Sequence, residues 1–497
     1  MNILLLSMPD SFEHMPSVAI RMPNGALASL AGNVDPHHRV AIADLILAQQ
    51  SVRETVERLV REIEPDVVGL SVMTFQRHTA LRIIELVRRL RPAARIVVGG
   101  YDASLAPEAY MAPDAGVDFI VRGEGELTFR ELIRAVERGT DPAGVAGLSF
   151  KDGDGFTHNP DRSVSSLDGG DVRLPNRSAR VLHGYTMVGR QVDVVETSRG
   201  CTFDCSFCSI IEMRGRNFHT YDFGRVLDDI RDARAHGARA IFLVDDNITL
   251  NVRRFEGLCR AIIEAGLSDL DYTVQAMTSA IANHGKTLAP LMRRAGFRYV
   301  FLGIENILEE DLEFLRAEAK NRQRGEGAGG GNAAVTAIEY LHANKMYVVG
   351  GLIVGNPQDT RASIEANLAF ARRYVDVPYI QHPTPYPRTP MTKTFREQGL
   401  IINERLEDYD GTTAVVRTAH LESDEIEFLR WRADRWIKLK HLPVALLHTP
   451  LFALRNGLKM LRYTFRGTTI RSILGLEDER KSFERYRALR RAERVYL

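Results

Sequence analysis

The stretch "VDVVETSRGCTFDCSFC", residues 192–208, joins an apolar run of strand type to three closely spaced cysteines. Val and Thr favour a strand in its first half, and the turn that follows carries Cys201, Cys205 and Cys208 in the spacing C-x3-C-x2-C. The whole chain has only four cysteines. So few thiols in 497 residues exclude a disulfide framework, and their clustering indicates metal or redox chemistry.

Three thiolates leave a structural zinc site incomplete, because such a site takes four protein ligands. His219 is the nearest further candidate, but no Cys or His pair completes a standard zinc pattern. A four-iron cluster can instead be held by three thiolates, which leaves one iron open to another molecule. We favour the cluster and keep zinc as the alternative. The fourth cysteine, Cys259, lies on an apolar helical stripe and is expected in the core.

A βα rhythm continues beyond the cysteines, and helical patterns separate its apolar runs. Six such units predict a partial (β/α)6 barrel over residues 191–395, with its chemistry where the strands end. The predicted strands are "VDVVETS" (192–198), "AIFLVDD" (240–246), "DYTVQAM" (271–277), "YVFLGIE" (299–305), "YVVGGLIVG" (347–355) and "YIQHP" (379–383). The glycine-rich segment 324–332 lacks the Lys-Ser/Thr ending of a phosphate loop and is interpreted as a flexible insertion.

The cysteine motif, with aromatic Phe207 before its last cysteine, resembles that of the radical S-adenosylmethionine enzymes. The resemblance implies that Cys201, Cys205 and Cys208 are catalytic and hold a 4Fe-4S cluster. Its open iron would bind S-adenosylmethionine, and reductive cleavage would give a 5′-deoxyadenosyl radical. Later strand ends match the family as well, and the resemblance implies contacts to S-adenosylmethionine from Asp245, Asp246, Gln275, Glu305 and the segment 350–357.

Each of these later matches also has a structural alternative. Asp245 could cap a helix, and Gln275 could be a hydrogen-bonded amide of the core. Arg388 stands in "PTPYPRTP" (383–390) where the related enzymes often have a glycine. We expect this arginine to be solvated, with a substrate anion as the alternative.

Residues 1–150 alternate short apolar runs with helical segments and predict a doubly wound, Rossmann-like parallel sheet. Ligands of such sheets bind at the carboxyl ends of the strands. Polar and glycine residues gather there and let a bulky ligand approach the backbone. The predicted strands are "NILLLS" (2–7), "RVAIADL" (39–45), "DVVGLSV" (66–72), "RIVVGG" (95–100) and "DFIVRG" (118–123).

The segments "VVGGYDASLAPE" (97–108) and "VDFIVRGEGELTFRELI" (117–133) resemble the cobalamin-binding domain that precedes the radical domain in one subgroup. The cobalt-ligating pattern D-x-H-x-x-G is missing, and "DPHHRV" (35–40) lacks its glycine and precedes the second strand. The subgroup typically binds cobalamin without a lower histidine. The resemblance implies a cobalamin site formed by Met8, Ser71, Thr74, Phe75, Gly99, Gly100, Tyr101, Gly123 and Glu124.

Together the implied cofactors indicate a methyltransferase that acts on an unactivated carbon of a small molecule and needs an external one-electron reductant. An oxidative cyclase of the anaerobic porphyrin type is the second interpretation. A cobalamin sensor or binding module is a third and would tolerate loss of Cys205. A tRNA methylthiotransferase would need the cysteines of a second cluster, and only Cys259 remains.

The net charge of +1 conceals a basic C-terminal region, because residues 432–497 hold sixteen Lys/Arg against six Asp/Glu. We expect a polar linker at 151–190 and a helical, basic region at 396–497. Five apolar residues recur at helical spacing, namely Leu451, Leu454, Leu458, Leu461 and Phe465, while Arg455, Lys459, Arg462 and Arg466 fall on another face. The stripe either packs on the barrel, as most such stripes do, or contacts an anionic membrane, which would favour a hydrophobic substrate such as the terpenoids of the hopanoid methylases.

The N-terminus lacks the basic flank and the cleavage site of a signal peptide, and no apolar run is long enough to span a membrane. We therefore expect a cytoplasmic protein, with a peripheral contact at the inner membrane surface as a further possibility. Few stacking aromatics interrupt the basic tail. A nucleic-acid partner is not expected.

Overall fold

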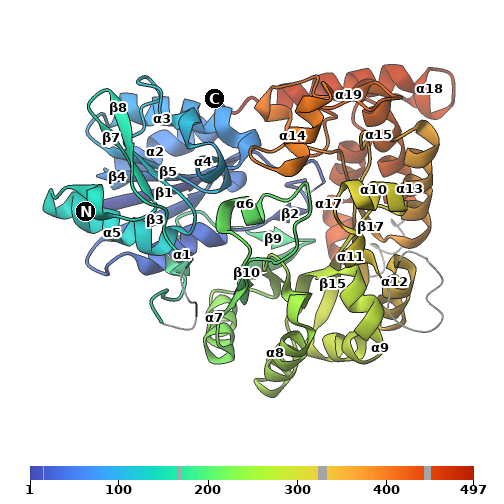
Figure 1. Ribbon diagram of the computed structural model, residues 1–497, viewed down its shortest axis with the longest axis horizontal. Coiled ribbons are helices and arrows are strands. Elements are labelled where there is room, and N and C mark those ends of the chain that lie inside the picture. The colour runs from blue at the N-terminus through green and yellow to red at the C-terminus, as the bar shows by residue number, and fades with distance from the viewer. Residues whose placement is uncertain (15, 165–166, 168–169, 323–332, 441–448) are drawn as a thin grey trace.

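The computed structural model describes residues 1–14, 16–164, 167, 170–322, 333–440 and 449–497. Two sheets organise it, and each has most of its strands in one of the two predicted α/β regions (Figure 1). The interpretation of 324–332 as a flexible insertion falls outside the described residues.

The first sheet has five parallel strands followed by an antiparallel hairpin. Helices cover this sheet on both sides, so the residues on both of its faces are apolar. This explains the near-continuous hydrophobic runs of its strands. In spatial order the strands are β3 (Arg39–Asp44), β1 (Asn2–Ser7), β4 (Val67–Ser71), β5 (Arg95–Gly99), β6 (Phe119–Val121), β7 (Leu148–Asp152) and β8 (Gly155–His158). The doubly wound fold is confirmed.

Helices α2 (Val52–Ile63) and α3 (Arg77–Leu90) cover one face of this sheet, and α1 (Gly25–Asn33) and α5 (Gly125–Arg138) cover the other. The short α4 (Tyr101–Leu105) follows β5. The strand ends are in register, because Ser7 pairs with both Asp44 and Ser71, and Ser71 pairs with Gly99. The carboxyl ends of four strands therefore form one straight rim.

The first sheet extends beyond the predicted boundary at residue 150. The polar stretch 151–171 was expected to be a connection, but its first part forms β8 and pairs with β7. Three of the four β8 residues are exposed, so the strand carries no apolar signal. The linker accordingly begins after His158.

The second sheet holds the six predicted strands in parallel, sequential order and remains open, as expected of a partial barrel. Two short antiparallel strands extend its first edge. The spatial order is β17 (Val377–Gln381), β16 (Tyr347–Ile353), β15 (Phe297–Glu305), β14 (Asp271–Met277), β13 (Ala240–Leu243), β10 (Arg190–Val195), β9 (Thr186–Met187) and β2 (Ile20–Arg21). Strand β2 comes from the N-terminal region and was not predicted.

Helices pack their apolar stripes on the outside of this sheet and form one large core. Cys259 lies in that core, fully buried, as predicted. The helices are α7 (Phe223–Ala235), α8 (Val252–Glu264), α9 (Thr278–Ala295), α12 (Ala334–Ala343) and α13 (Arg361–Tyr374). The short α10 (Glu309–Phe314) and α11 (Glu318–Asn321) do not contribute to this core, and Leu312 of α10 belongs to a smaller apolar cluster.

The C-terminal region is helical, as expected, and returns to the N-terminal loop. Its helices are α14 (Pro390–Glu397), α15 (Ser423–Lys440), α17 (Pro450–Thr464), α18 (Ile470–Ile473) and α19 (Glu479–Glu493). Arg466 and Tyr463 both bond Glu13, and α19 packs on α15 through an aromatic cluster. No helix in the described ranges is both long and apolar enough to cross a bilayer.

Most of the apolar stripe of α17 does not pack on the barrel. Leu451, Leu454 and Leu458 are exposed, which contradicts the more ordinary of the two expectations, whereas Leu461 and Phe465 are half-buried. Arg466 was grouped with the solvent-facing basic residues, but it is half-buried and paired with Glu13. The helix is held by its other side, which the amphipathic pattern alone does not reveal.

Candidate active site

The three clustered cysteines follow the first strand of the barrel. Cys201 comes after β11 (Ser198–Arg199), which pairs with β12 (His219–Thr220). Gly200 has φ +89°, and a Cβ there would lie 2.4 Å from the Asn217 carbonyl oxygen. Only glycine fits this crossing. The tight crossing fixes where the loop begins, and Cys201 and Cys205 are buried while Cys208 is half-buried.

The spacing of the thiols argues against a single zinc ion. One zinc ion with bonds of about 2.3 Å would bring its thiolates to within roughly 3.8 Å of one another. Among the described residues, just one group of three Cys, His, Asp or Glu ligand atoms lies within 4.8 Å, and it contains no cysteine. His219 is likewise outside it. The wider spacing fits a larger group, such as the cluster, between the sulfurs.

Polar side chains from later strands converge on the cysteine loop. The Asn247 amide lies 3.6 Å from Cys201 Sγ and donates to it. Lys320 Nζ lies 3.5 Å from Glu305 Oε1 and 5.8 Å from the centre of the Phe207 ring. Burial raises the pKa of the Cys208 thiol to about 12, while the Lys320 charge opposes that shift. A metal centre would deprotonate such thiols, and Lys320 supplies one compensating positive charge.

Asp245 and Asp246 follow β13 but have different environments. The Asp245 carboxylate is fully buried and accepts bonds from Thr197 N at 2.7 Å and from the Thr197 hydroxyl at 2.5 Å. Burial raises its pKa to about 7. Asp246 accepts from Gly200 N at 2.8 Å and from Arg214 Nη1 at 3.0 Å. In this structure both carboxylates brace the cysteine loop and the strand before it.

Gln275 and Glu305 lie on neighbouring strands of the same sheet. Gln275 is half-buried in β14, and Glu305 ends β15 with φ +60°, a conformation uncommon outside glycine. A Cβ on Gly303 would meet Glu305 Oε1 at 2.8 Å, so this glycine leaves room for the carboxylate. Arg388 is exposed, as expected, and its φ of +66° reproduces the left-handed conformation that a glycine would adopt there.

A cavity of about 400 Å³ lies between the two sheets. Strand ends and helices of the first domain line one side, and Glu196, Arg199, Arg214 and Tyr221 of the barrel region line the other. Six of the residues predicted for cobalamin line it, namely Ser71, Gly99, Gly100, Tyr101, Gly123 and Glu124.

The other three predicted cobalamin residues lie elsewhere. Met8 and Phe75 are buried in hydrophobic clusters, and Thr74 is buried beside Phe75. Met73, which the prediction passed over, does line the cavity. The chain turns into a short 3-10 helix at Thr74, which carries the next side chains inward.

Glycines keep the floor of the cavity free of side chains. Gly100 has φ +94° and ψ −169°, and a Cβ there would lie 2.8 Å from the Val72 carbonyl oxygen. Gly123 has φ +72° with open space in front of it. The buried Glu124 Oε1 accepts no hydrogen bond within the described part of the chain. An open backbone floor beside an acceptor that has an ion-pair contact but no hydrogen bond fits a large ligand that carries amide donors.

Arg199 connects the cysteine loop to the first domain. Its Nη2 lies 2.6 Å from Glu126 Oε1, its Nε lies 2.7 Å from Glu196 Oε2, and its Nη1 lies 3.7 Å from Glu124 Oε1. Burial alone would raise the pKa of Glu126, but the Arg199 guanidinium lowers it to about 2. Burial raises the pKa of the Tyr101 phenol, and the charge of Asp246 raises it further.

Comparisons with known proteins agree with both halves of this site. Residues 15–133 match the B12 binding domain family, and residues 195–371 match the Radical SAM superfamily. The chain belongs to the cobalamin-dependent radical S-adenosylmethionine enzymes. Its cofactors are a 4Fe-4S cluster, S-adenosylmethionine and cobalamin.

Relatives of this radical S-adenosylmethionine enzyme include a methyltransferase and a cyclase. It is 28% identical to an uncharacterized methyltransferase of Pyrococcus horikoshii, over 87% of this chain and 91% of that protein. It is 27% identical to the anaerobic magnesium-protoporphyrin IX monomethyl ester cyclase of Cereibacter sphaeroides, over 81% and 63% of the two chains. The methyltransferase TsrM from Kitasatospora setae, solved with cobalamin and a [4Fe-4S] cluster, shares the fold at TM-score 0.64 and 21% identity, over 80% and 78%.

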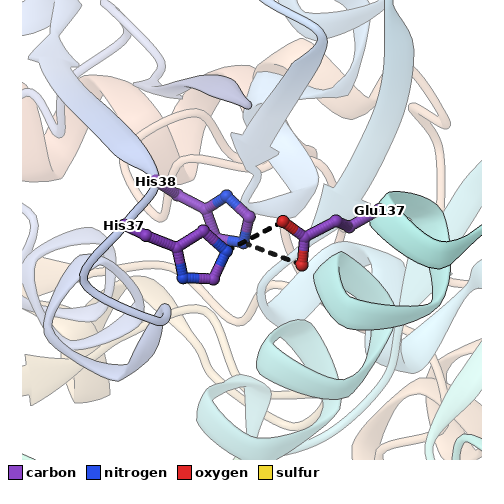
Figure 2. A group of neighbouring side chains, drawn as sticks. All are labelled: His37, His38 and Glu137. Carbon is purple, nitrogen blue, oxygen red and sulfur yellow. Dashed lines mark hydrogen bonds and ion pairs between the residues drawn. The ribbon is translucent and has the colours of Figure 1, made fainter.

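A second ligand cluster in the cobalamin-binding domain is remote from the rim. His37 Nε2 lies 2.8 Å from Glu137 Oε1, and His38 Nε2 lies 3.8 Å from Glu137 Oε2 (Figure 2). The histidines precede β3 and Glu137 ends α5, so the cluster lies at the amino end of the strand. The exclusion of "DPHHRV" as a cobalt-ligating motif therefore agrees with its position.

Three residues of the radical S-adenosylmethionine site escaped the sequence analysis. Arg199 stands two residues before Cys201 and Asn247 directly follows Asp246, but the partners of both are remote in the chain. Lys320 lies on the short α11, in a segment with no strand before it. A signal existed only for Asn247, which ends the strand-end motif "FLVDDN" (242–247).

Proposed function

We propose that this enzyme transfers a methyl group to an unactivated carbon of a small-molecule substrate. The observation that carries the proposal is the cavity shared by the glycine-lined rim of the first sheet and by residues flanking the cysteine loop. When bound, cobalamin supplies a transferable methyl group, and the cluster with S-adenosylmethionine supplies the one-electron chemistry. A reaction that needs both cofactors requires a common space of this kind.

The protein's own residues would position and shield these groups. Cys201, Cys205 and Cys208 would hold the cluster, with Asn247 donating to the first thiolate. Gly100 and Gly123 would let the corrin lie against the backbone, and Glu124 Oε1 would accept a bond from one of its amides. Tyr101 would close the space between the two centres and exclude water from it.

The substrate we propose is hydrophobic and of membrane origin, and the electron comes from an external reductant. The exposed leucines of α17 support the first part, because a soluble substrate would not require them. One observation supports the external reductant. Within the described residues, the strand ends offer a single cysteine cluster.

Anaerobic reconstitution with iron, sulfide and cobalamin tests the proposal. The holoenzyme is supplied with dithionite, S-adenosylmethionine labelled in its methyl group, and a lipid extract. We expect a lipid that has gained one labelled methyl group, together with S-adenosylhomocysteine and 5′-deoxyadenosine. The Cys205→Ala variant, loaded with cobalamin alone, is the control and should give none of these products.

An oxidative cyclisation is the second candidate, and the similarity to the cyclase of Cereibacter sphaeroides supports it. The two reactions differ in product mass, since methylation adds one CH2 and cyclisation adds none. A product that forms with 5′-deoxyadenosine but without label would favour the cyclase. Turnover by the Cys205→Ala variant would contradict both candidates.

A further inference from the structure

Exposed apolar side chains concentrate on the segment 450–476, which we call the C-terminal arm and which comprises α17, α18 and the turns after them. Seven of the fourteen large apolar side chains that are exposed in the described chain lie there. Leu454 is 83% exposed, and Leu458 and Ile470 are 74% and 76% exposed. The other four are Leu451, Ile473, Leu474 and Leu476. Single exposed leucines are ordinary, but a concentration of this size marks an interaction surface.

The inner side of the arm is firmly held, so the exposed leucines do not belong to a loose tail. The Tyr463 hydroxyl donates to the Glu13 carbonyl at 3.1 Å, and the Arg466 guanidinium bonds the Glu13 carboxylate. Phe452 packs closely against Gly189. A Cβ added to residue 189 would lie 3.0 Å from the Cβ of Phe452. Figure 1 places α18 at the edge of the molecule farthest from the first domain. The arm thus presents its outer side on a fixed support.

The charge of the arm has one sign. Residues 435–476 contain eight Lys/Arg and no Asp/Glu. Arg455, Lys459, Arg462 and Arg471 are exposed, and none forms an ion pair with another described residue. The neighbouring helix α19 is equally basic, but Arg487 and Arg490 on it pair with Asp424 and Asp410. All four exposed basic side chains of the arm therefore lack an acidic partner among the described residues, whereas four of the six basic side chains on α19 have one.

The two kinds of side chain are sorted around α17. At 3.6 residues per turn, Leu451, Leu454 and Leu458 span a sector about 60° wide. By the same geometry Arg455, Lys459 and Arg462 occupy the adjacent sector, also about 60° wide. An apolar sector bordered by a basic one is the arrangement that lies flat in the interface of an anionic bilayer. The leucines reach the acyl chains, and the basic groups meet the phosphates.

We propose that the C-terminal arm docks the enzyme on the surface of an anionic membrane. A second copy of the chain fits this surface poorly, because a twofold contact brings each patch against itself and would face the four basic side chains with one another. Docking requires neither cofactor nor turnover, so this proposal stands apart from methyl transfer.

Sedimentation of the reconstituted, full-length enzyme with vesicles tests the proposal. We expect it to pellet with vesicles of phosphatidylcholine and phosphatidylglycerol and much less with phosphatidylcholine alone. Binding should weaken as salt rises, since salt screens the basic groups. The variant Arg455→Gln/Lys459→Gln/Arg462→Gln should bind roughly a hundredfold more weakly, because three basic groups no longer interact with the anionic surface.

A matched pair of variants distinguishes binding through the arm from nonspecific adsorption to vesicles. Leu454→Glu/Leu458→Glu should abolish pelleting, whereas Ile402→Glu/Leu489→Glu, which alters exposed apolar residues outside the arm, should pellet like the parent. Circular dichroism and the melting temperature check that each variant is folded. Salt-independent binding, equal loss in both pairs, or pelleting without vesicles through self-association would overturn the proposal.

Discussion

The two sheets end in opposite kinds of residue. Strands of the first sheet end in glycines such as Gly99 and Gly100, which leave the backbone open to the cavity. Strands of the second sheet end in side chains that donate hydrogen bonds or carry charge, such as Asn247 and Glu305. The difference suits the groups that we propose they hold. A broad corrin needs empty space, whereas a cluster with a charged nucleotide needs fixed ligands and compensating charge.

Arg199 connects the region of the cysteine loop to the first sheet. It stands two residues before the first cysteine and forms its shortest contact with Glu126, at the start of a helix of the cobalamin-binding domain. Each sheet should therefore lose its own cofactor independently, while a change at Arg199 should affect both. The following predictions test that division.

The largest effect is expected for Cys205→Ala. Loss of one of three thiolates should abolish the iron-sulfur absorbance and the cleavage of S-adenosylmethionine completely. Cobalamin binding, followed by its visible spectrum, should stay within twofold of the parent, because Cys205 does not line the cavity. Loss of cobalamin together with the cluster would contradict the claim that each sheet loses its own cofactor independently.

Replacing Arg199 by Met should destabilise the protein by about 3–5 kcal/mol, because Glu126 would remain as an unpaired buried charge. Urea unfolding, followed through the cobalamin and cluster spectra, measures the loss at each centre. Adding Glu126→Gln to the Met variant should recover part of it, and the double-mutant cycle should give a coupling of about 0.5–3 kcal/mol. A change at one centre alone would argue against a bridging role.

Gly100→Val should weaken cobalamin binding and leave the cluster intact. The backbone at Gly100 lies in a region open essentially to glycine alone, and strain there costs about 1–3 kcal/mol, or roughly five- to 150-fold in affinity. Titration with cobalamin measures the loss. Gly144→Ala, at a glycine with ordinary φ and open surroundings, should bind like the parent.

The smallest effect is expected for Asp204→Asn, within the cysteine motif itself. The Asp204 side chain is 45% exposed and pairs with the exposed Arg216 at 2.6 Å, so its loss should cost no more than about 1 kcal/mol. Iron content and melting temperature should match the parent. A marked loss of iron would mean that charges outside the cluster shell matter more than the buried contacts of Asn247 and Lys320.

The strands and most of the rim could be predicted because apolar runs ending in glycine or polar residues are a local signal. β2 and β8 could not, because they are two and four residues long and carry no continuous apolar run. The role of Arg199 depends on Glu126, 73 positions away in the chain. The amphipathic pattern of α17 was visible, but a pattern does not tell what covers it.

Strand β2 has a consequence for how the chain can be divided. Because Ile20 and Arg21 pair with β9 at the edge of the barrel sheet, a fragment that starts near residue 180 would have the cysteine loop but a bare β9 edge. Such a piece should associate or precipitate when expressed alone. Adding a separate peptide that contains Ile20 and Arg21 should keep the fragment in solution only if the bare β9 edge causes the association.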